Sequence, residues 1–568
     1  MTAPQNDSDS IWHFAATALG ATGCDLVAGV PTDEPGLLDA ARAVPGLTAL
    51  AVRDQRAGAC MAAGHAIVSG CPAVLAVSTG PPLPNALTGL LEAAALCAPL
   101  VVVTTRIPRA GLGRGGFQQV DQQAVTAAVA KSHIVAEDLA QLTWALRHAV
   151  HQAVNGVPGI AVVELTAELL GERPPAEAFG GRPVRRLRSV PADDELRRAL
   201  DVLTGARSPV IVAGGGAKAA AAGPAVRRLA ETWGAAVFAT AAGRGVIDEE
   251  HPAYCGLAGL YTTPPAHELL NSADVVLALG TRLEETVRMG WESLPESRLV
   301  HVDVDPDSFD RGVRPEIALV GDAALTADLL AALLSPYEPG LWAKRIAAVK
   351  AALSEPLGHE STAAAALRAV RETFGRDIVL VQENGLHDMW SYHYPLLSLS
   401  ERSRVVVPGE QTMMGFGVAA SIGAALAEPS LPAVVVCGDG ALTLSLNVLP
   451  TAAEQGRGIT FVVFENDGFG WPRFIRGQEG VDDGLTRFGA TARPYGEVVG
   501  SLGGWMARPR DAQEFEAVFK EAAGCAAAGR LTLVCVPVDD QDVPPGIRRI
   551  FGEPGSASSS TGLNEVKQ

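Results

Sequence analysis

The chain has 568 residues, 48% of them hydrophobic, and a formal net charge of −18. This length predicts about four domains at about 150 residues each, and an acidic chain without a cluster of Lys and Arg argues against nucleic acid and anionic membranes as partners. No apolar stretch reaches the roughly 20 residues of a membrane span, so we expect a cytoplasmic protein whose partners are small molecules and other copies of itself.

Short β-branched runs alternate three times with Ala- and Leu-rich segments of helical length. This rhythm predicts three α/β domains, each with a doubly wound parallel sheet. We expect domains over residues 1–180, 190–336 and 360–550, followed by a disordered Gly- and Ser-rich tail at 552–568. The predicted strands are 74–77, 101–104 and 161–165; then 210–213, 275–279 and 300–304; then 378–381, 405–407, 433–436, 461–464 and 533–536.

A glycine-rich stretch follows the first predicted strand of the central domain. The sequence Gly214-Gly215-Gly216-Ala217 fits the fingerprint of a dinucleotide-binding turn. That fingerprint also needs an acidic residue about 20 positions further on, at the end of the next strand. Residues 236–240 hold that place and have no carboxylate. We therefore interpret the glycines as a tight turn with close helix packing, and NAD is not expected.

The most informative motif is Gly438-Asp439-Gly440, which ends the apolar run 433–437 and is followed 26 positions later by Asn466. Such a run predicts a strand that is covered on both faces, and ligands bind at the carboxyl ends of such strands. Mg²⁺ prefers about six oxygen ligands and keeps phosphate oxygens among them. Asp439 offers a carboxylate, Asn466 an amide oxygen and Gly468 a main-chain carbonyl. The motif therefore predicts a site for magnesium and a diphosphate.

The longer stretch from Ile422-Gly423 to Ala441, with Asn466 beyond it, resembles the signature of thiamine-diphosphate enzymes. The similarity extends through nearly the whole chain and is greatest to the acetohydroxyacid synthase and pyruvate oxidase branch. Further matching stretches are 29–31, 78–81, 117–121, 384–390 and 413–417. The resemblance implies thiamine diphosphate and Mg²⁺ as cofactors. It also implies that the three domains are pyrimidine-binding, central and diphosphate-binding.

The resemblance also implies which residues hold the cofactor. The Thr412 carbonyl would accept a hydrogen bond from the exocyclic amine, Met414 would bend the cofactor, and His387 would meet the diphosphate. Ordinary core packing is the alternative for Met414, and a structural role is the alternative for His387. The implied cofactor-binding residues are Gly385, His387, Thr412, Met414, Gly438, Asp439, Gly440, Ala441, Asn466 and Gly468, with Asp439, Asn466 and Gly468 on the metal.

Two further pairs are candidates for contacts with the substrate. By resemblance, Phe117 and Gln118 would face the reacting carbon; the alternative is an ordinary connecting loop. Trp471 and Arg473 follow the metal motif and could shape the acceptor pocket or bind a substrate carboxylate, to which Arg is suited. Simple surface placement is the alternative for this second pair.

Gln55 stands where the family places a glutamate that shares a proton with the aminopyrimidine ring of the cofactor. A carboxamide can form a hydrogen bond with the ring but cannot transfer a proton in that way. A positioned acid or base contributes about 10²–10⁴ in rate. Three interpretations remain open: a slower working enzyme, rescue by Asp54, or a cofactor-binding relic. Asp54 has an ordinary alternative as a helix N-cap.

By resemblance, the chain is a carboligase that decarboxylates a 2-oxo acid and adds the resulting enamine to an acceptor carbonyl, like acetolactate synthase. Simple decarboxylation and a non-catalytic cofactor-binding subunit are the alternatives. FAD is doubtful because Thr262 and Thr286 stand where we expect a glycine and an arginine. The resemblance also implies a homodimer or homotetramer. The eight scattered cysteines predict buried thiols in a reducing compartment, not a disulfide framework.

Overall fold

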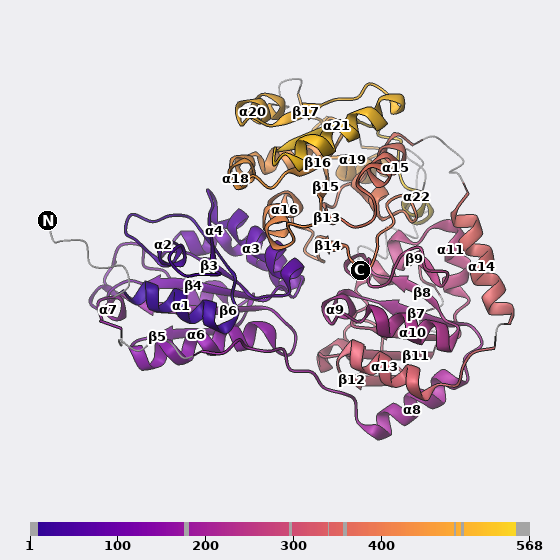
Figure 1. Ribbon diagram of the computed structural model, residues 1–568, viewed down its shortest axis with the longest axis horizontal. Helices are drawn as coiled ribbons and strands as arrows, with labels where there is room; N and C mark the ends of the chain where they lie inside the picture. The colour runs from indigo at the N-terminus through magenta and orange to yellow at the C-terminus, as the bar shows by residue number, and fades with distance from the viewer. Residues whose placement is uncertain are drawn as a thin grey trace. The chain divides into compact units, whose positions relative to one another are not determined.

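The structure is a computed structural model that describes residues 10–174, 181–292, 294, 298–338, 340–355, 361–481, 484–489 and 494–552. The described residues form three six-stranded sheets joined by helices (Figure 1). The predicted α/β fold class is therefore confirmed. The tail at 553–568, which was predicted to be disordered, lies outside the described residues, so that prediction is not tested. Five cysteines are buried as expected, whereas three are only partly so: Cys71, Cys97 and Cys525.

The chain divides into two compact units. The first comprises Met1–Leu187, Pro408–Ser430 and Leu444–Ile459, and the second comprises Arg188–Val407, Leu431–Thr443 and Thr460–Gln568. The first unit contains one sheet and the second contains two.

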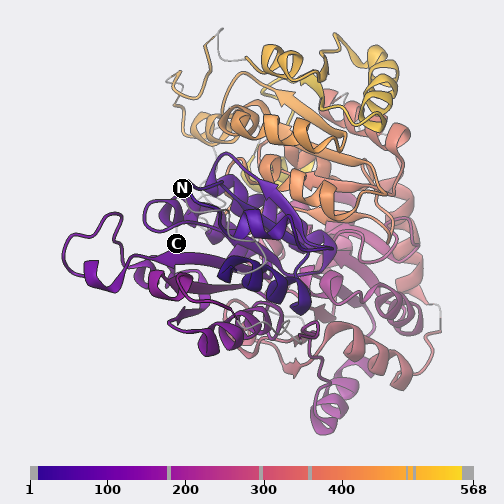
Figure 2. The same cartoon turned by 60° about the vertical axis from the view of Figure 1, so that its left-hand side comes forward.

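The sheet of the first unit has the strand order β2-β1-β3-β4-β6-β5 and is indigo to violet in Figure 2. All seven residues of β6 are buried, because both faces of the sheet are covered. The strands are β1 (Leu26–Gly29), β2 (Thr48–Ala51), β3 (Ala73–Ala76), β4 (Leu100–Arg106), β5 (Ala130–Ala136) and β6 (Ile160–Thr166). The helices are α1 (Ile11–Thr22), α2 (Leu37–Ala41), α3 (Gln55–Ser69), α4 (Pro82–Ala95), α5 (Gln122–Thr126), α6 (Leu139–Val154), α7 (Ala167–Leu170), α16 (Phe416–Ala427) and α18 (Leu449–Gln455).

Helices α3 and α16 cross in close contact because each has a glycine at the crossing. A Cβ atom on Gly64 would lie 2.2 Å from the Ala420 carbonyl oxygen. A Cβ atom on Gly423 would lie 1.8 Å from the Met61 carbonyl oxygen. The absence of side chains at these two positions therefore lets the backbones approach.

The first sheet of the second unit has the order β12-β11-β10-β7-β8-β9. Its strands are β7 (Pro209–Ala213), β8 (Ala236–Ala239), β9 (Tyr254–Leu257), β10 (Val275–Leu279), β11 (Arg298–Asp303) and β12 (Ile317–Val320). Its helices are α8 (Asp193–Thr204), α9 (Gly215–Ala219), α10 (Gly223–Trp233), α11 (Pro264–Asn271), α12 (Glu285–Arg288), α13 (Ala323–Leu333) and α14 (Leu341–Leu353).

In a sheet of this order, a dinucleotide binds in the crevice between the ends of the two central strands, here β7 and β10. The Gly216 amide donates a hydrogen bond to the Gly280 carbonyl oxygen across that crevice, at 2.9 Å. A Cβ atom on Gly214 would lie 2.4 Å from the same oxygen. These contacts favour our interpretation of the glycines as a close-packed turn.

The other sheet of the second unit has the order β14-β13-β15-β16-β18-β17. Its strands are β13 (Val379–Gln382), β14 (Arg404–Val406), β15 (Ala433–Gly438), β16 (Ile459–Glu465), β17 (Trp505–Ala507) and β18 (Thr532–Pro537). Its helices are α15 (Thr362–Phe374), α17 (Asp439–Leu444), α19 (Gly470–Gln478), α20 (Tyr495–Ser501), α21 (Phe515–Ala527) and α22 (Pro545–Phe551).

A buried arginine, paired with a glutamate, connects segments that belong to the two sheets of the second unit. Arg244 and Glu249 are 2% and 0% exposed, and Arg244 Nε lies 3.2 Å from Glu249 Oε1. Arg244 also donates hydrogen bonds to the carbonyl oxygens of Ser391, at 2.8 Å, and Leu397. The segment that follows β13 is therefore fixed to the region around β8 and β9 by a buried charge that is paired and hydrogen-bonded.

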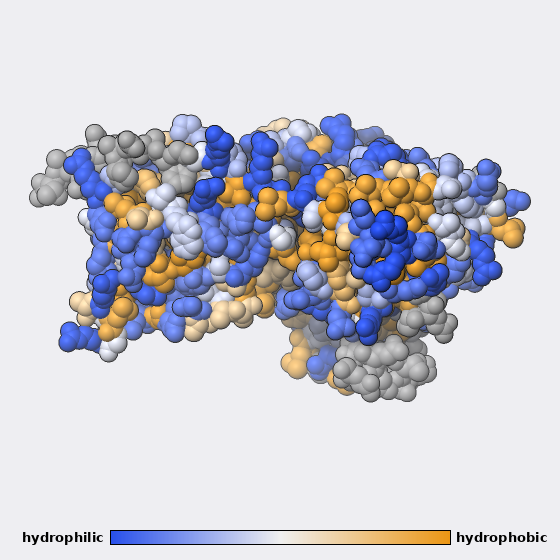
Figure 3. Space-filling model, turned by 90° about the horizontal axis from the view of Figure 1, so that it is seen from below, coloured by the Kyte–Doolittle hydropathy of each residue, from blue (hydrophilic) through white to orange (hydrophobic). Residues whose placement is uncertain are grey.

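On the face drawn in Figure 3, hydrophobic residues are interspersed with hydrophilic ones. Among the described residues, no helix combines the length and apolar character needed to cross a membrane.

Candidate active site

The motif Gly438-Asp439-Gly440 lies where the strand order of its sheet reverses direction. Strands β13 and β15 are neighbours, and β14 lies on one side of them while β16 lies on the other. Open α/β sheets bind ligands at such a point, outside the carboxyl ends of the strands. Gly438 ends β15, Asp439 begins α17, and Asn466 follows β16. The sheet topology therefore explains why residues distant in sequence meet here.

Three oxygen atoms converge at this point. The side-chain oxygen of Asn466 lies 2.9 Å from the Gly468 carbonyl oxygen and 3.3 Å from Asp439 Oδ1. Oxygens bound to one Mg²⁺ at 2.0–2.1 Å in an octahedron are about 2.9 Å apart along each edge. Turning the amide by half a turn would replace these contacts with hydrogen bonds. A cation between the three oxygens would satisfy them without that rotation.

His387 favours the orientation that aims the Asn466 oxygen at Gly468. His387 Nε2 lies 2.9 Å from the Asp539 carbonyl oxygen, which can only accept a hydrogen bond. Burial lowers the pKa of His387, so the ring is neutral and its other nitrogen, Nδ1, is an acceptor. The Asn466 amide nitrogen lies 3.2 Å from Nδ1 and is the donor that this nitrogen needs. Both ring nitrogens of His387 are thus engaged, and the ring orients the amide of Asn466.

The other predicted residues of this unit surround the same point. A Cβ atom on Gly385 would lie 2.7 Å from Asp388 Oδ2, so a larger residue there would displace that carboxylate. Gly440 lies against the ring of Phe469, and Ala441 is buried in the first turn of α17. Amides in the first turn of a helix are donors suited to phosphate oxygens.

Asp388 is a site residue that the sequence prediction missed. Its side chain is buried, and burial followed by the charge of Asp439 raises the pKa of Asp388 to about 7. A second carboxyl group therefore lies next to the predicted metal ligand. An acidic residue inside the otherwise apolar and aromatic stretch 386–390 was the available signal.

Arg473 contacts the backbone of the protein, whereas the place of Trp471 relative to a substrate stays a prediction. The Arg473 side chain is only 12% exposed and donates to the carbonyl oxygens of Asn466, Asp467 and Thr486. Trp471 packs against Phe551 at a ring-centroid distance of 5.3 Å. The alternative of simple surface placement is wrong for Arg473, because the guanidinium is buried against the backbone.

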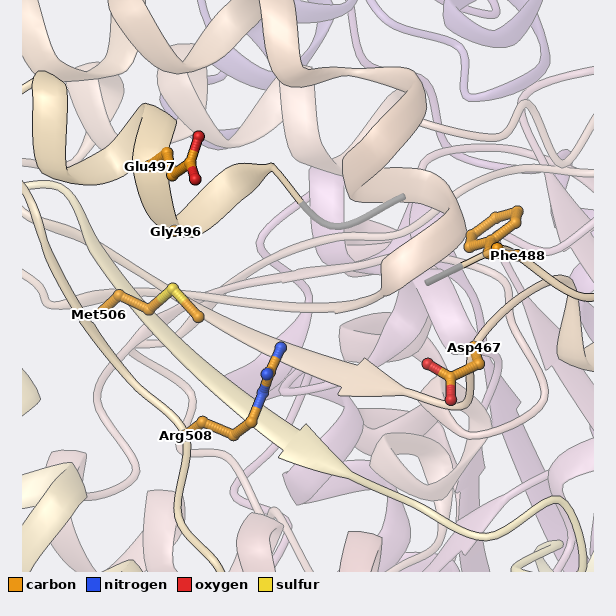
Figure 4. Close-up of a pocket in the computed structure, with 7 residues that line it drawn as sticks. Asp467, Phe488, Gly496, Glu497, Met506 and Arg508 are labelled. Atoms are coloured by element: carbon orange, nitrogen blue, oxygen red, sulfur yellow. The ribbon is translucent and has the colours of Figure 1, made fainter. Parts of the chain in front are cut away.

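A hollow of 780 Å³ lies beside the metal motif (Figure 4). Asp467 and Arg508 point toward it from opposite sides. Arg508 is held by Glu465 at 2.6 Å, and the Tyr495 hydroxyl also donates to this buried carboxylate. The residues that line the hollow are Asp467, Phe488, Gly489, Gly496, Glu497, Met506 and Arg508.

The remaining predicted residues belong to the first unit. Thr412 is in the left-handed backbone region at φ 46°, and the Met414 side chain is 40% exposed. The core-packing alternative for Met414 is therefore wrong. Buried Glu92 holds their segment in place, because its carboxylate accepts hydrogen bonds from the amides of Gly409 and, at 2.8 Å, Met413.

Gln55 is the first residue of α3. Its Oε1 accepts a hydrogen bond from Asn85 Nδ2 at 2.6 Å, which leaves its own amide group as the available donor. Asp54 is the N-cap of α3 and accepts from the Ala57 amide at 2.8 Å. Rescue of the missing glutamate by Asp54 is disfavoured, because its carboxylate is engaged in the cap.

Phe117 and Gln118 lie on the loop between β4 and α5. The Phe117 side chain is 85% exposed, an unusual position for a large apolar side chain. Gln118 has φ 60° and lies against Gly80, where a Cβ atom would be 2.7 Å from the Gln118 Cβ. The stretches 78–81 and 117–121 are therefore in contact.

Comparison with known proteins identifies the family. Three family models match the chain: the N-terminal thiamine pyrophosphate binding domain of thiamine pyrophosphate enzymes over residues 12–125, their central domain over 196–333, and their C-terminal thiamine pyrophosphate binding domain over 383–536. The chain belongs to the thiamine pyrophosphate enzyme family. The family predicted from sequence is thus confirmed, and the protein is a thiamine-diphosphate-dependent enzyme.

Several proteins similar to this chain are named as acetolactate synthase large subunits. The probable acetolactate synthase large subunit of Methanocaldococcus jannaschii is 27% identical over 454 residues, which are 76% of each chain. The large subunit of acetolactate synthase isozyme 3 of Escherichia coli is 27% identical over 530 residues, or 89% of this chain and 90% of the relative. The large subunit of isozyme 2 from the same organism is 26% identical over 465 residues, or 81% and 84%.

Proposed function

We propose that the protein is a thiamine-diphosphate-dependent carboligase that acts on a 2-oxo acid and an acceptor carbonyl compound. The observation that carries this proposal is the convergence of oxygens from Asp439, Asn466 and Gly468, within a chain similar to acetolactate synthases along most of its length. Such a set of oxygens suits Mg²⁺ together with a diphosphate. Carbon dioxide would leave the 2-oxo acid, and the remaining carbons would be joined to the acceptor.

The residues of the second unit would hold the metal and the diphosphate. Asp439, Asn466 and Gly468 would each give one oxygen to Mg²⁺. The amides of Gly440 and Ala441 would donate to phosphate oxygens, and Gly385 and Gly438 would leave room for the backbone to approach them. Bound thiamine diphosphate supplies the carbon nucleophile and the electron sink that decarboxylation needs.

Five residues would act at the pyrimidine end of a bound cofactor. The Thr412 carbonyl would accept from the exocyclic amine, the exposed Met414 would support the bent cofactor, and Phe117 and Gln118 would face the reacting carbon. Gln55, with its carbonyl oxygen held by Asn85, would donate a hydrogen bond to a ring nitrogen without transferring a proton. Proton movement at the ring would therefore be slower than with a glutamate.

The reaction can be tested directly. The protein is incubated with Mg²⁺, thiamine diphosphate and a panel of 2-oxo acids, each alone and with a second carbonyl compound, and the products are measured by mass spectrometry. A coupled product formed with loss of carbon dioxide supports the proposal. Free aldehyde alone would instead mean a decarboxylase, and no reaction would mean a non-catalytic cofactor-binding subunit. As a control, Asp439→Asn removes the charged metal ligand and should weaken Mg²⁺-dependent cofactor binding more than tenfold.

We also propose the domain boundaries, the compartment and the assembly of the protein. The boundaries 1–180, 190–336 and 360–550 would define pyrimidine-binding, central and diphosphate-binding domains, consistent with one sheet in each range. The protein would work in the cytoplasm as a homodimer or homotetramer and without FAD. Light scattering tests the assembly, and a stoichiometric yellow chromophore in the purified protein would contradict the absence of flavin.

A further inference from the structure

The turn that carries the proposed metal ligands has a backbone conformation that is uncommon for L-amino acids. Asp467 has φ 59° and Gly468 has φ 150°. A Cβ atom on Gly468 would lie 2.0 Å from the Thr486 carbonyl oxygen, so only glycine fits there. This conformation directs the Gly468 carbonyl toward Asn466, and a conformation of this kind persists only when surrounding contacts hold it.

Arg473 supplies contacts of that kind. One terminal nitrogen, Nη1, donates to the Asn466 carbonyl oxygen at 3.0 Å and to the Asp540 carboxylate. The other, Nη2, donates to the carbonyl oxygens of Asp467 and Thr486, both at 3.1 Å. The planar guanidinium can reach several acceptors in fixed directions, which a lysine cannot do. It therefore joins two consecutive carbonyls of the turn to the segment that folds back over Gly468.

Asp540 explains how a positive charge is tolerated beside a cation site. Its Oδ1 atom pairs with Arg473, and its Oδ2 atom lies 3.5 Å from the Arg487 guanidinium. The carboxylate offsets the charge of Arg473, so the guanidinium can hold the turn without a net repulsion of Mg²⁺. The neighbouring Asp539 acts on the same ligand by another route, because its carbonyl holds His387 and His387 holds the Asn466 amide.

We propose that Arg473 is a positioning residue that fixes the metal-binding turn, and that Asp540 holds Arg473 in place and offsets its charge. This inference rests on the proposed metal site. It replaces the hypothesis that Arg473 binds a substrate carboxylate, because both terminal nitrogens already donate to the protein. Removing a group that hydrogen-bonds to a metal ligand commonly weakens metal binding about 10–100-fold.

The test uses Mn²⁺ as the probe, titrated into the full-length protein with excess thiamine diphosphate and followed by electron paramagnetic resonance of the free ion. Arg473→Met should weaken Mn²⁺ binding about 10–100-fold. Asp540→Asn should weaken it as well, because it leaves the Arg473 charge unbalanced. The matched control is Arg487→Met, which removes the other partner of Asp540 at a half-exposed position and should change the affinity about threefold at most.

The unfolding of each variant is measured without metal, so that loss of stability and loss of metal affinity are separated. If folded Arg473→Met binds Mn²⁺ as tightly as the wild type, the inference is wrong and Arg473 is merely structural. If Arg473→Met does not fold, Arg473→Lys is tested instead, because lysine keeps the positive charge but lacks the planar set of donors. An intermediate Mn²⁺ affinity of that variant supports the inference, and wild-type affinity overturns it. Failure of the wild-type protein to bind Mn²⁺ would overturn the metal site itself.

Discussion

Replacing Gly423 with alanine should separate α3 and α16, which begin at or close to the predicted site residues Gln55 and Met414. Helix α3 begins at Gln55, and α16 begins two residues after Met414. An added Cβ atom would lie 1.8 Å from the Met61 carbonyl oxygen, whereas ordinary contacts begin near 3.4 Å. The backbones must therefore move apart by about 1.6 Å, because neither a main-chain oxygen nor a methyl group can rotate away.

Overpacking of this kind typically costs about 1–3 kcal/mol, and alanine regains about 1 kcal/mol through its better helix propensity. We expect Gly423→Ala to lower the free energy of unfolding by up to about 2 kcal/mol in urea denaturation and to weaken thiamine diphosphate binding. Gly20→Ala, within α1, is the matched control. Its Cβ atom would lie 3.5 Å from Val44 Cγ1, which is an ordinary van der Waals distance. It should be neutral or stabilise by up to about 1 kcal/mol. Equal unfolding midpoints for the two variants would refute the reasoning.

Gln55→Glu should speed deuterium exchange at the C2 position of the bound cofactor by up to about 10²–10⁴, as measured by NMR. Asp54→Asn is the control, and it should leave exchange unchanged while costing about 1 kcal/mol of stability as a lost helix cap. Slower exchange in Asp54→Asn with no gain in Gln55→Glu would mean that Gln55 does not occupy the glutamate position. His387→Phe removes the acceptor for the Asn466 amide and should weaken Mg²⁺ binding about 10–100-fold in calorimetry, so an unchanged affinity would argue against this orienting role. Burial raises the pKa of Asp388 from 3.8 to about 7, so the folded protein without metal keeps a proton there that the unfolded chain loses. The free energy of unfolding therefore declines as the pH rises toward 7. Asp388→Asn should flatten that decline in urea denaturation between pH 5 and 8, and an unchanged slope would contradict the raised pKa.

The strands that could be predicted from the sequence are the ones with continuous apolar runs. The runs at 433–436 and 461–464 form β15 and β16, whose residues are almost all buried because both faces of the sheet are covered. The edge strands β5 and β17 were among those missed, as was the short internal strand β1. The residues of β5 and β17 are mostly only partly buried, and an edge strand has one neighbour and needs no continuous apolar run.

The proximity of Asp439 and Asn466 was predictable for a related reason, since both follow strands that end at the same edge of one sheet. The role of Arg473 was not predictable. It depends on Asp540, which is 67 residues further along the chain, and on Thr486, which reaches the turn only because the intervening segment folds back. No local pattern records a contact of that kind. The engagement of Asp54 as an N-cap, by contrast, followed from its position before a helix.

The buried Arg244–Glu249 pair determines where the chain can be divided for experiments. A fragment that ends near residue 336 would keep both charges but lose the carbonyl oxygens of Ser391 and Leu397, to which Arg244 donates. It would also lose Lys350, which donates to the Glu249 carbonyl oxygen at 3.1 Å. Removing the partners of a buried charge is strongly destabilising, so such a fragment should express poorly. Fragments intended for study of the central sheet should therefore retain the chain through residue 399.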